Sequence, residues 1–296
     1  MHKSGFVNII GMPNVGKSTL MNALLGEKMS IITSKPQTTR HRILGIYNDD
    51  DYQIVFSDSP GIIDDPAYGM QQSMNKFAYS GFEDADIILF ELDLFEDYEG
   101  DEKVIKLLKE TTIPKYLVIN KIDLDKDGRL DALKVKWKEL IDFDKTFEIS
   151  ALNGTNVESL LSTIKENLNE GPAYYDKDQM SDKNVRFFVS EIIRESILQQ
   201  YKQEIPYSCE VVVDEYKDSL KQDQPFAHIY ASIYVSRKTQ KSILIGKGGV
   251  AIKRLGIESR KKIEDFIDHP IYLELKVKVR ENWRDDDRQL KYFGYN

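Results

Sequence analysis

The chain has 296 residues, 41% of them hydrophobic, with a formal net charge of -8 and one cysteine. This length accommodates two domains of ordinary size, each with its own core. The overall charge gives no signal of nucleic-acid binding, and a single cysteine excludes an intramolecular disulfide and a thiolate metal cluster. No apolar run reaches the roughly 18 residues that span a bilayer, and a strand begins at once where a signal peptide would carry its apolar region. We expect a cytoplasmic protein and leave a peripheral membrane contact open.

A phosphate-binding loop is predicted where an apolar strand at 6–10 runs into an apolar helix pattern that starts near Leu20. The segment 11–19 fits G-x-x-x-x-G-K-[ST], in which the glycines let backbone N–H groups point at phosphate oxygens and the helix adds its positive dipole end. Lys17 then reaches the β and γ phosphates, and Ser18 places its hydroxyl on Mg²⁺. An ordinary glycine turn is the alternative. The expected phosphate-side contacts are Gly11, Asn14, Val15, Gly16, Lys17, Ser18 and Thr19.

A polar segment without periodicity, 30–40, predicts a mobile loop. Two apolar runs follow at 43–47 and 52–56 and predict an antiparallel hairpin. The second run ends in D-x-P-G, which contains Asp58 and Gly61. An aspartate at the end of a strand can hold Mg²⁺ through water, and the N–H of Gly61 can reach a γ-phosphate.

A base-recognition motif follows the predicted strand 116–119, because that strand runs into Asn-Lys-Ile-Asp. The Asp123 carboxylate can accept from both N1–H and the 2-amino group of guanine, which adenine does not offer. Asn120 holds the loop, and Lys121 lies along the base. Losing one of these pairs leaves a buried polar group unsatisfied, so we expect discrimination of ~10⁴ or more against other bases.

A last short strand, 146–149, leads to Ser150, Ala151 and Leu152, and the N–H of Ala151 can donate to guanine O6. The segment 155–158 then predicts a capping box that opens an amphipathic helix. Each motif has a trivial explanation alone. Together they stand at the carboxyl ends of strands, the edge at which doubly wound sheets bind ligands. The sequence therefore predicts a doubly wound α/β sheet with a nucleotide site.

In this order the motifs resemble those of the translation-factor-related GTPases over residues 3–170. The resemblance implies a threonine that completes a Mg²⁺ shell with Ser18 and Asp58. Thr38 and Thr39 both qualify, and Thr39 is favoured because it precedes an arginine.

The same resemblance places Ile62 where Ras-like enzymes carry a glutamine that orients water. An apolar side chain cannot align water, so we expect slow intrinsic hydrolysis, with an activation of ~10⁵ to come from elsewhere. Asn14 has two alternative roles: it helps to hold a potassium ion beside the phosphates, or it braces the loop. The predicted catalytic residues are Lys17, Thr39, Gly61 and Asn14.

A break in periodicity at 173–181 predicts a linker between a GTPase domain at 1–172 and a second domain at 182–296. Charge differs between the parts. Residues 1–172 hold 19 basic and 29 acidic side chains, whereas residues 237–280 hold 12 basic and 5 acidic ones. The local positive excess is a potential footprint for a polyanion.

The second domain is expected to begin with a helix capped by Ser181 or Asp182, followed by strands at 208–216 and 227–236. The next segment, 242–256, places G-x-x-G between a short and a longer helix and resembles a KH domain, here a small α+β domain of type II. About four nucleotides of single-stranded RNA fit such a groove. The expected RNA contacts are Gly246, Lys247, Gly248, Gly249, Lys253 and Arg254.

The tail of the chain predicts a short terminal helix, and Trp283 either stacks on RNA or packs on the domain, with packing favoured. A GTPase domain followed by a KH domain, together with Gln-Thr-Thr-Arg-His-Arg at 37–42 and the tail 283–295, closely resembles the bacterial Era family throughout the chain. The resemblance implies a monomeric, Mg²⁺-dependent GTPase that binds 16S ribosomal RNA near its 3′ end and assists assembly of the small (30S) ribosomal subunit.

The expected mechanism is a switch: GTP orders the Thr39 loop and favours RNA binding, and hydrolysis releases the RNA. Two alternatives belong to other classes. One is an RNA-binding module whose nucleotide domain never turns over. The other is a signalling or membrane-associated GTPase whose KH-like half binds protein.

Overall fold

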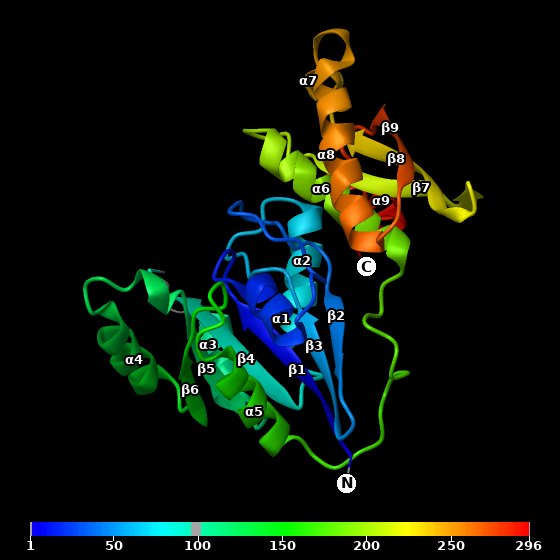
Figure 1. Cartoon of the computed structure of the whole chain (residues 1–296). Helices are drawn as coiled ribbons and strands as arrows, with labels where there is room; N and C mark the ends of the chain where they lie inside the picture. The colour runs from blue at the N-terminus through cyan, green and yellow to red at the C-terminus, as the bar shows by residue number, and fades with distance from the viewer. Residues whose placement is uncertain (1, 96–101, 296) are drawn as a thin grey trace. The chain divides into compact units, whose positions relative to one another are not determined.

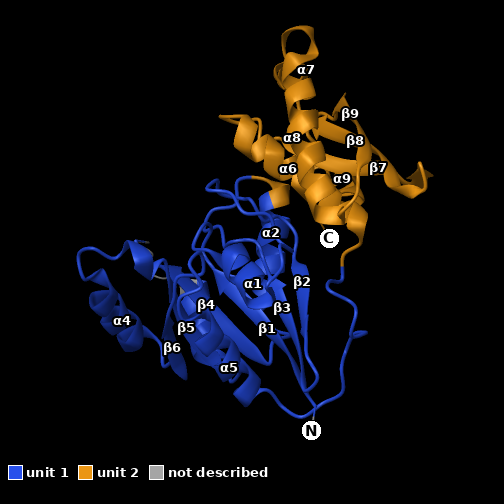
Figure 2. Cartoon of the chain, in the orientation of Figure 1, with its two compact units in different colours: residues 1–67, 71–182 blue, residues 68–70, 183–296 orange. Residues whose placement is uncertain are grey.

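The computed structural model describes residues 2–95 and 102–295 (Figure 1). The chain divides into two compact units (Figure 2). Unit 1 comprises residues 1–67 and 71–182, and unit 2 comprises residues 68–70 and 183–296.

Unit 1 is built on a six-stranded sheet in the order β2-β3-β1-β4-β5-β6. All neighbouring strands are parallel except the β2–β3 pair, which forms the predicted antiparallel hairpin. The order runs in opposite directions on the two sides of β1, so the phosphate-binding loop that follows β1 lies at the switch point where doubly wound sheets bind ligands. The strands are β1 (Lys3–Gly11), β2 (Ile43–Asn48), β3 (Tyr52–Asp58), β4 (Ile87–Asp93), β5 (Lys115–Asn120) and β6 (Lys145–Glu148).

Helices cover both faces of this sheet, as its buried, apolar central strands require. Helices α1 (Lys17–Leu25) and α5 (Val157–Asn167) pack against each other. Apolar side chains of α2 (Gly69–Ser80), α3 (Glu102–Glu110) and α4 (Arg129–Leu140) join one core cluster with Ile10 and Phe90. The predicted doubly wound α/β class is confirmed.

The capping box predicted at 155–158 is wrong. Asn156 is the N-cap of α5, with φ of 60° and no side-chain capping bond. Its amide donates instead to the Glu148 carbonyl (2.7 Å), while the backbone of Thr155 pairs with Ser150. These bonds tie the turn at 155–156 to the residues around the 150–152 loop, so the side chains of the turn do not cap the helix.

Unit 2 contains a three-stranded sheet in the order β7-β8-β9, in which β7 (Cys209–Lys221) and β8 (Gln224–Val235) are antiparallel and β9 (Ile271–Val279) is parallel to β8. Alternate β8 residues such as Ile229 and Ile233 are fully buried. Their face packs in one core with apolar side chains of the helices α6 (Val185–Gln200), α7 (Lys238–Ile245) and α8 (Val250–Ile267). This is the predicted small α+β domain.

Two local predictions in unit 2 need correction. Asn184, not Ser181 or Asp182, caps α6 by accepting from Phe187 N (3.1 Å). Ser181 Oγ instead donates to the Leu44 carbonyl (2.5 Å), and an Asp182 carboxylate oxygen accepts from Leu44 N (3.0 Å), so both residues belong to the edge of the unit 1 sheet. The β7–β8 hairpin is also longer than predicted.

The hairpin closes in a tight turn at Gln222 and Asp223, both with positive φ, which is the backbone that two-residue hairpin turns require.

The end of the chain packs on unit 2, as the favoured interpretation predicted. Trp283 is fully buried, and its indole N–H donates to the Ser208 carbonyl (3.2 Å). Phe293 lies edge-on to it, just after the short helix α9 (Asp287–Tyr292). Trp283 is therefore a core residue and is not available for stacking on RNA.

Candidate nucleotide site and RNA groove

A cavity of about 480 Å³ opens in unit 1 and brings together most of the predicted nucleotide residues. Gly11, Val15, Asp58 and Ala151 are buried and are not among its lining residues. The predicted residues that line the cavity are Asn14, Gly16, Lys17, Ser18, Thr19, Thr39, Gly61, Asn120, Lys121, Asp123, Ser150 and Leu152.

The phosphate-binding loop has room only for glycine at two positions. Gly16 has φ of 125°, and a Cβ there would collide with the side chains of Asn120 and Glu91. A Cβ at Gly11 would collide with the Glu91 carbonyl. The loop is thus pressed against β4 and β5 on one side, while its residues Asn14, Gly16 and Lys17 line the cavity.

Lys17 is held inside the loop. Its ammonium donates to the carbonyls of Gly11 (3.1 Å) and Met12 (2.7 Å), and its side chain is buried. Helix α1 begins at this lysine, and no side chain caps its first turn. Its first N–H groups therefore have no side-chain acceptor at the N-cap, which is the usual arrangement where a helix receives an anion.

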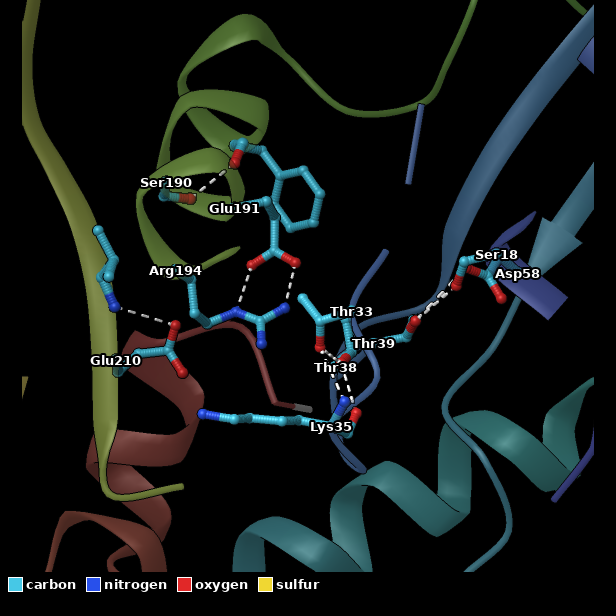
Figure 3. Close-up of polar contacts among 12 residues, drawn as sticks. Ser18, Thr33, Lys35, Thr38, Thr39, Asp58, Ser190, Glu191, Arg194 and Glu210 are labelled. Carbon is cyan, nitrogen blue, oxygen red and sulfur yellow. Dashed lines mark hydrogen bonds and ion pairs between the residues drawn. The ribbon is translucent and has the colours of Figure 1, made fainter. Parts of the chain in front are cut away.

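Three oxygen-bearing side chains, those of Ser18, Thr39 and Asp58, converge at the residue that follows Lys17 (Figure 3). Ser18 Oγ lies 2.6 Å from Asp58 Oδ2 and 2.9 Å from Thr39 Oγ1, and Thr39 Oγ1 lies 3.5 Å from the same carboxylate oxygen. Thr38 points elsewhere, because its hydroxyl bonds to Thr33 Oγ1 and the Lys35 carbonyl (2.6 Å each). The geometry therefore places Thr39, and not Thr38, in this cluster.

Asp58 has the chemistry of a ligand for a hard cation. It is fully buried, and its Oδ1 has no hydrogen-bond partner among the described residues. Burial raises the pKa of this carboxyl, while the Ser18 hydroxyl and the Lys17 charge lower it. An orphaned carboxylate oxygen beside two hydroxyls fits Mg²⁺, which takes oxygen ligands.

Glu91 is a site residue that sequence reasoning missed. It is fully buried in β4 behind Gly16, and its Oε1 accepts from Asn120 Nδ2 (2.7 Å), whereas Oε2 has no partner among the described residues. Burial raises its pKa from 4.5 to about 7, and the Asp58 charge acts in the same direction. The available signal was a glutamate inside an otherwise apolar buried strand.

Asn120 ties three segments together. Its Oδ1 accepts from the backbone N–H groups of Lys121 (2.7 Å) and Ala151 (3.0 Å), and its Nδ2 also donates to the Val15 carbonyl (3.3 Å). The Ala151 N–H, predicted to donate to guanine O6, is therefore bonded to Asn120 in this structure. Its contact with guanine stays a prediction.

The remaining base-loop residues lie around the cavity. Lys121 Nζ donates to the Asn14 carbonyl (2.8 Å) and pairs with Asp93, a partner that sequence reasoning did not identify. Asp123 is exposed in a short 3-10 helix, Ile122–Leu124, where its carboxylate lines the cavity. This arrangement leaves the Asp123 carboxylate accessible to a base.

No polar side chain takes the water-orienting position after Gly61. Ile62 is fully buried in the apolar core and donates its N–H to the Gly11 carbonyl (3.3 Å). A Cβ at Gly61 would collide with the backbone of Pro13. The backbone at 61–62 therefore lies directly against the phosphate-binding loop at Pro13, and the side chain of the next loop residue, Asn14, is exposed.

The G-x-x-G turn of unit 2 leaves its outer side open. Gly246, Gly248 and Gly249 all have positive φ. A Cβ at Gly248 or Gly249 would meet nothing within 4 Å, so a ligand backbone has clearance there. Lys247, Lys253 and Arg254 are exposed on the turn and the first turns of α8. Apolar side chains of Ile243 and Val250 are exposed beside them.

Within the residues that the structure describes, every helix is too short or too polar to cross a bilayer.

The family described as "50S ribosome-binding GTPase" matches residues 6–121, and the family described as "KH domain" matches residues 204–284. GTPase Era of Lactobacillus helveticus is 45% identical over 294 residues, which make up 99% of this chain and 96% of that protein.

A chloroplastic GTPase ERA-like protein of Oryza sativa subsp. japonica is 44% identical over 300 residues, which make up 99% of this chain and 70% of that protein.

Two solved structures are similar over nearly the whole chain. A structure of Era in complex with MgGDPNP and nucleotides 1506–1542 of 16S ribosomal RNA has a TM-score of 0.91 and 37% identity, covering 100% of this chain and 99% of that one. A variant of Aquifex aeolicus Era bound to GDP·AlF4⁻ has a TM-score of 0.89 and 36% identity, covering 99% of each chain.

Proposed function

The chain belongs to the Era family of GTPases, and from this we propose that it is a GTP-driven switch that binds 16S ribosomal RNA near its 3′ end and assists assembly of the small (30S) ribosomal subunit. One observation carries the proposal. The nucleotide cavity and the open G-x-x-G turn occur in one chain, which matches over its whole length a structure of Era in complex with MgGDPNP and nucleotides 1506–1542 of 16S ribosomal RNA.

The residues of unit 1 divide the work on GTP. Lys17 and the N–H groups of the loop hold the phosphates, and Asp123 and Asn120 select guanine. Ser18, Thr39 and Asp58 would hold Mg²⁺, which would neutralise phosphate charge. Ile62 cannot orient water, so intrinsic hydrolysis is slow.

The Thr39 loop couples the bound nucleotide to RNA binding. This loop continues directly into β2, whose outer edge pairs with the segment that precedes unit 2 through Ile46 N and the Met180 carbonyl (2.9 Å). A ligand that fixes Thr39 therefore also fixes the start of β2. We expect the GTP form to bind RNA more tightly than the GDP form.

The test is the affinity of the full chain for an RNA with the sequence of the 3′ end of 16S ribosomal RNA, measured by fluorescence anisotropy with GDP or GDPNP. We expect tighter binding with GDPNP, and loss of that difference in Thr39→Ala. Thr38→Ala is the matched control, because Thr38 lies outside the Ser18–Asp58 cluster. Equal affinity in both nucleotide states contradicts the switch.

Potassium is the proposed source of the missing activation, held with the help of Asn14. Phosphate release is expected to be faster in potassium than in sodium for the native chain and equally slow in both for Asn14→Ala. Equal rates in both salts for the native chain leave Asn14 with the bracing role. A monomeric state, a cytoplasmic location, a peripheral membrane contact and the domain limits 1–172, 173–181 and 182–296 stay predictions.

A further inference from the structure

The sheet of unit 2 has a second face, opposite the helices, that carries a row of aromatic rings. Phe226, His228 and Tyr230 alternate with the buried residues of β8, and Tyr272 lies beside them on β9. Neighbouring ring centroids are 5.1 Å (Phe226–His228), 5.8 Å (His228–Tyr272) and 6.0 Å (Tyr230–Tyr272) apart. These four residues are termed the aromatic face.

The end of the chain, residues 283–295, covers only one end of this side of the sheet. Tyr234, two positions beyond Ser232 on β8, is buried against Phe293. Further along the strand, Tyr272 is 46% exposed, and the other three rings are partly exposed. Because large aromatic groups are usually buried, four partly exposed rings in mutual contact on two strands form an apolar surface that needs a reason.

The charges around the aromatic face favour a polyanion. By strand register, five basic and four acidic side chains share this side of the sheet; one of the acidic ones, Glu210, is buried and accepts from the Tyr295 hydroxyl (2.6 Å). Lys221 lies over the Phe226 ring at 5.1 Å. The lysine–carboxylate pairs here are exposed, so a phosphate can exchange for the carboxylate at little cost. The basic residues are Lys217, Lys221, Lys276, Lys278 and Arg280, and the acidic ones that are not buried are Asp214, Glu215 and Glu274.

We propose that the aromatic face binds single-stranded RNA by stacking of bases on its rings, as a second contact for an RNA that is also held at the G-x-x-G turn. This rests on the RNA binding proposed above. A sheet that presents aromatic rings flanked by lysines matches single-strand binding, in which stacking is tolerant of sequence. Since α8 spans about 27 Å from the turn to the strand that carries Tyr272, only an RNA longer than the turn's roughly four nucleotides reaches both.

The test compares the full-length native chain with the double variant Tyr230→Ala/Tyr272→Ala. The probes are an RNA corresponding to nucleotides 1506–1542 of 16S ribosomal RNA and a tetranucleotide that is too short to reach from the G-x-x-G turn to the aromatic face. We expect the double alanine variant to bind the long RNA at least about tenfold more weakly and the tetranucleotide as the native chain does. Replacing both residues by phenylalanine keeps the rings and the affinity.

Leu220→Ala is the matched control, because Leu220 is 72% exposed on the opposite side of the same hairpin and should leave both affinities unchanged. If the double variant unfolds, Lys221→Glu tests the same surface through an exposed charge and should also weaken only the long RNA. Unchanged affinity for the long RNA in these variants overturns the proposal. This is also the result expected if the surface binds a protein instead of RNA. Failure of the native chain to bind either RNA instead contradicts the proposed function.

Discussion

Glu91 is a single buried residue that orders the nucleotide site and also lowers the stability of the fold. Its carboxyl fixes the amide of Asn120, which in turn holds the N–H groups of Lys121 and Ala151. The same carboxyl is fully buried with one oxygen unpartnered among the described residues, which penalises its charged form. The residue therefore orders the base loop at a cost in stability.

That cost predicts an unusual dependence of stability on pH. Because the folded chain holds the Glu91 proton more tightly, with a pKa of about 7 against 4.5, this group destabilises the fold increasingly as pH rises between those values. Glu91→Gln should be more stable than the native chain at pH 8, and the difference should shrink by about 2 kcal/mol at pH 5.5. Urea unfolding of the nucleotide-free chain measures it.

Glu83→Gln, a change at the surface of the same unit, should run parallel to the native chain over this pH range. A constant difference between Glu91→Gln and the native chain would show that the buried carboxyl does not titrate there.

Guanine selection is argued from a second residue, Asp123. An amide in place of its carboxylate cannot accept from both N1–H and the 2-amino group, whereas it can pair with xanthine. Asp123→Asn should lose at least about 100-fold in GTP affinity and gain affinity for xanthosine triphosphate. Displacement of a fluorescent guanine nucleotide measures both.

Asp125→Asn serves as control, because Asp125 accepts from Arg129 N (3.1 Å) and Leu130 N (3.3 Å) in the same turn and points to the helix instead of the base. Native GTP affinity in Asp123→Asn would refute the assignment of base recognition.

At the scale of elements, the edge strand β2 is protected by the segment that follows unit 1's last helix. Gln53 organises this contact from the neighbouring strand and is fully buried. Its Oε1 accepts from Tyr174 N (2.6 Å) and Tyr175 N (3.0 Å), and its Nε2 donates to the Tyr175 carbonyl and Asn48 Oδ1 (2.8 Å each). Covering an edge in this way prevents pairing with other chains.

Gln53→Leu should therefore release the segment 174–182 from the sheet. It leaves the backbone groups of Tyr174 and Tyr175 without partners, so we expect a loss of about 2 kcal/mol in unfolding free energy and faster amide exchange over 174–182. Gln72→Leu, an exposed change on α2, should do neither. Amide exchange over 174–182 that is unchanged in Gln53→Leu would mean that this segment is held by other contacts.

The sequence predicted the elements and motif positions because these depend on local spacing. The G-x-x-x-x-G-K-S and G-x-x-G segments each carry their own turn geometry, and strands β2 and β3 follow from the two apolar runs at 43–47 and 52–56. The errors arose where distant segments meet. Ser181 has a side chain suited to capping a helix, but its hydroxyl donates to the carbonyl of the distant Leu44 instead. The pairing of Lys121 with Asp93 depends on the register of β4 and β5, which spacing along the chain does not specify.

At the scale of the whole molecule, charge is divided unevenly. The chain carries a net charge of -8, yet residues 237–280 hold 12 basic against 5 acidic side chains. The overall charge opposes a polyanion, so RNA affinity must come from short-range contacts with unit 2. Exposed charges more than about 10 Å apart are screened at 0.1 M salt, which confines the unfavourable contribution to low ionic strength.

This distribution predicts how salt acts on RNA binding. Each phosphate neutralised by a lysine or arginine contributes about -0.7 to the slope of log affinity against log salt for a single strand. Lys247→Ala removes one exposed cation from the G-x-x-G turn without touching the core, so it should weaken binding and make the slope shallower by about 0.7. Lys138→Ala, an exposed lysine of α4, should leave both unchanged. A titration of RNA affinity between 50 and 400 mM potassium chloride, about eightfold in salt, separates these outcomes, and a native slope in Lys247→Ala would place the phosphate contact elsewhere on unit 2.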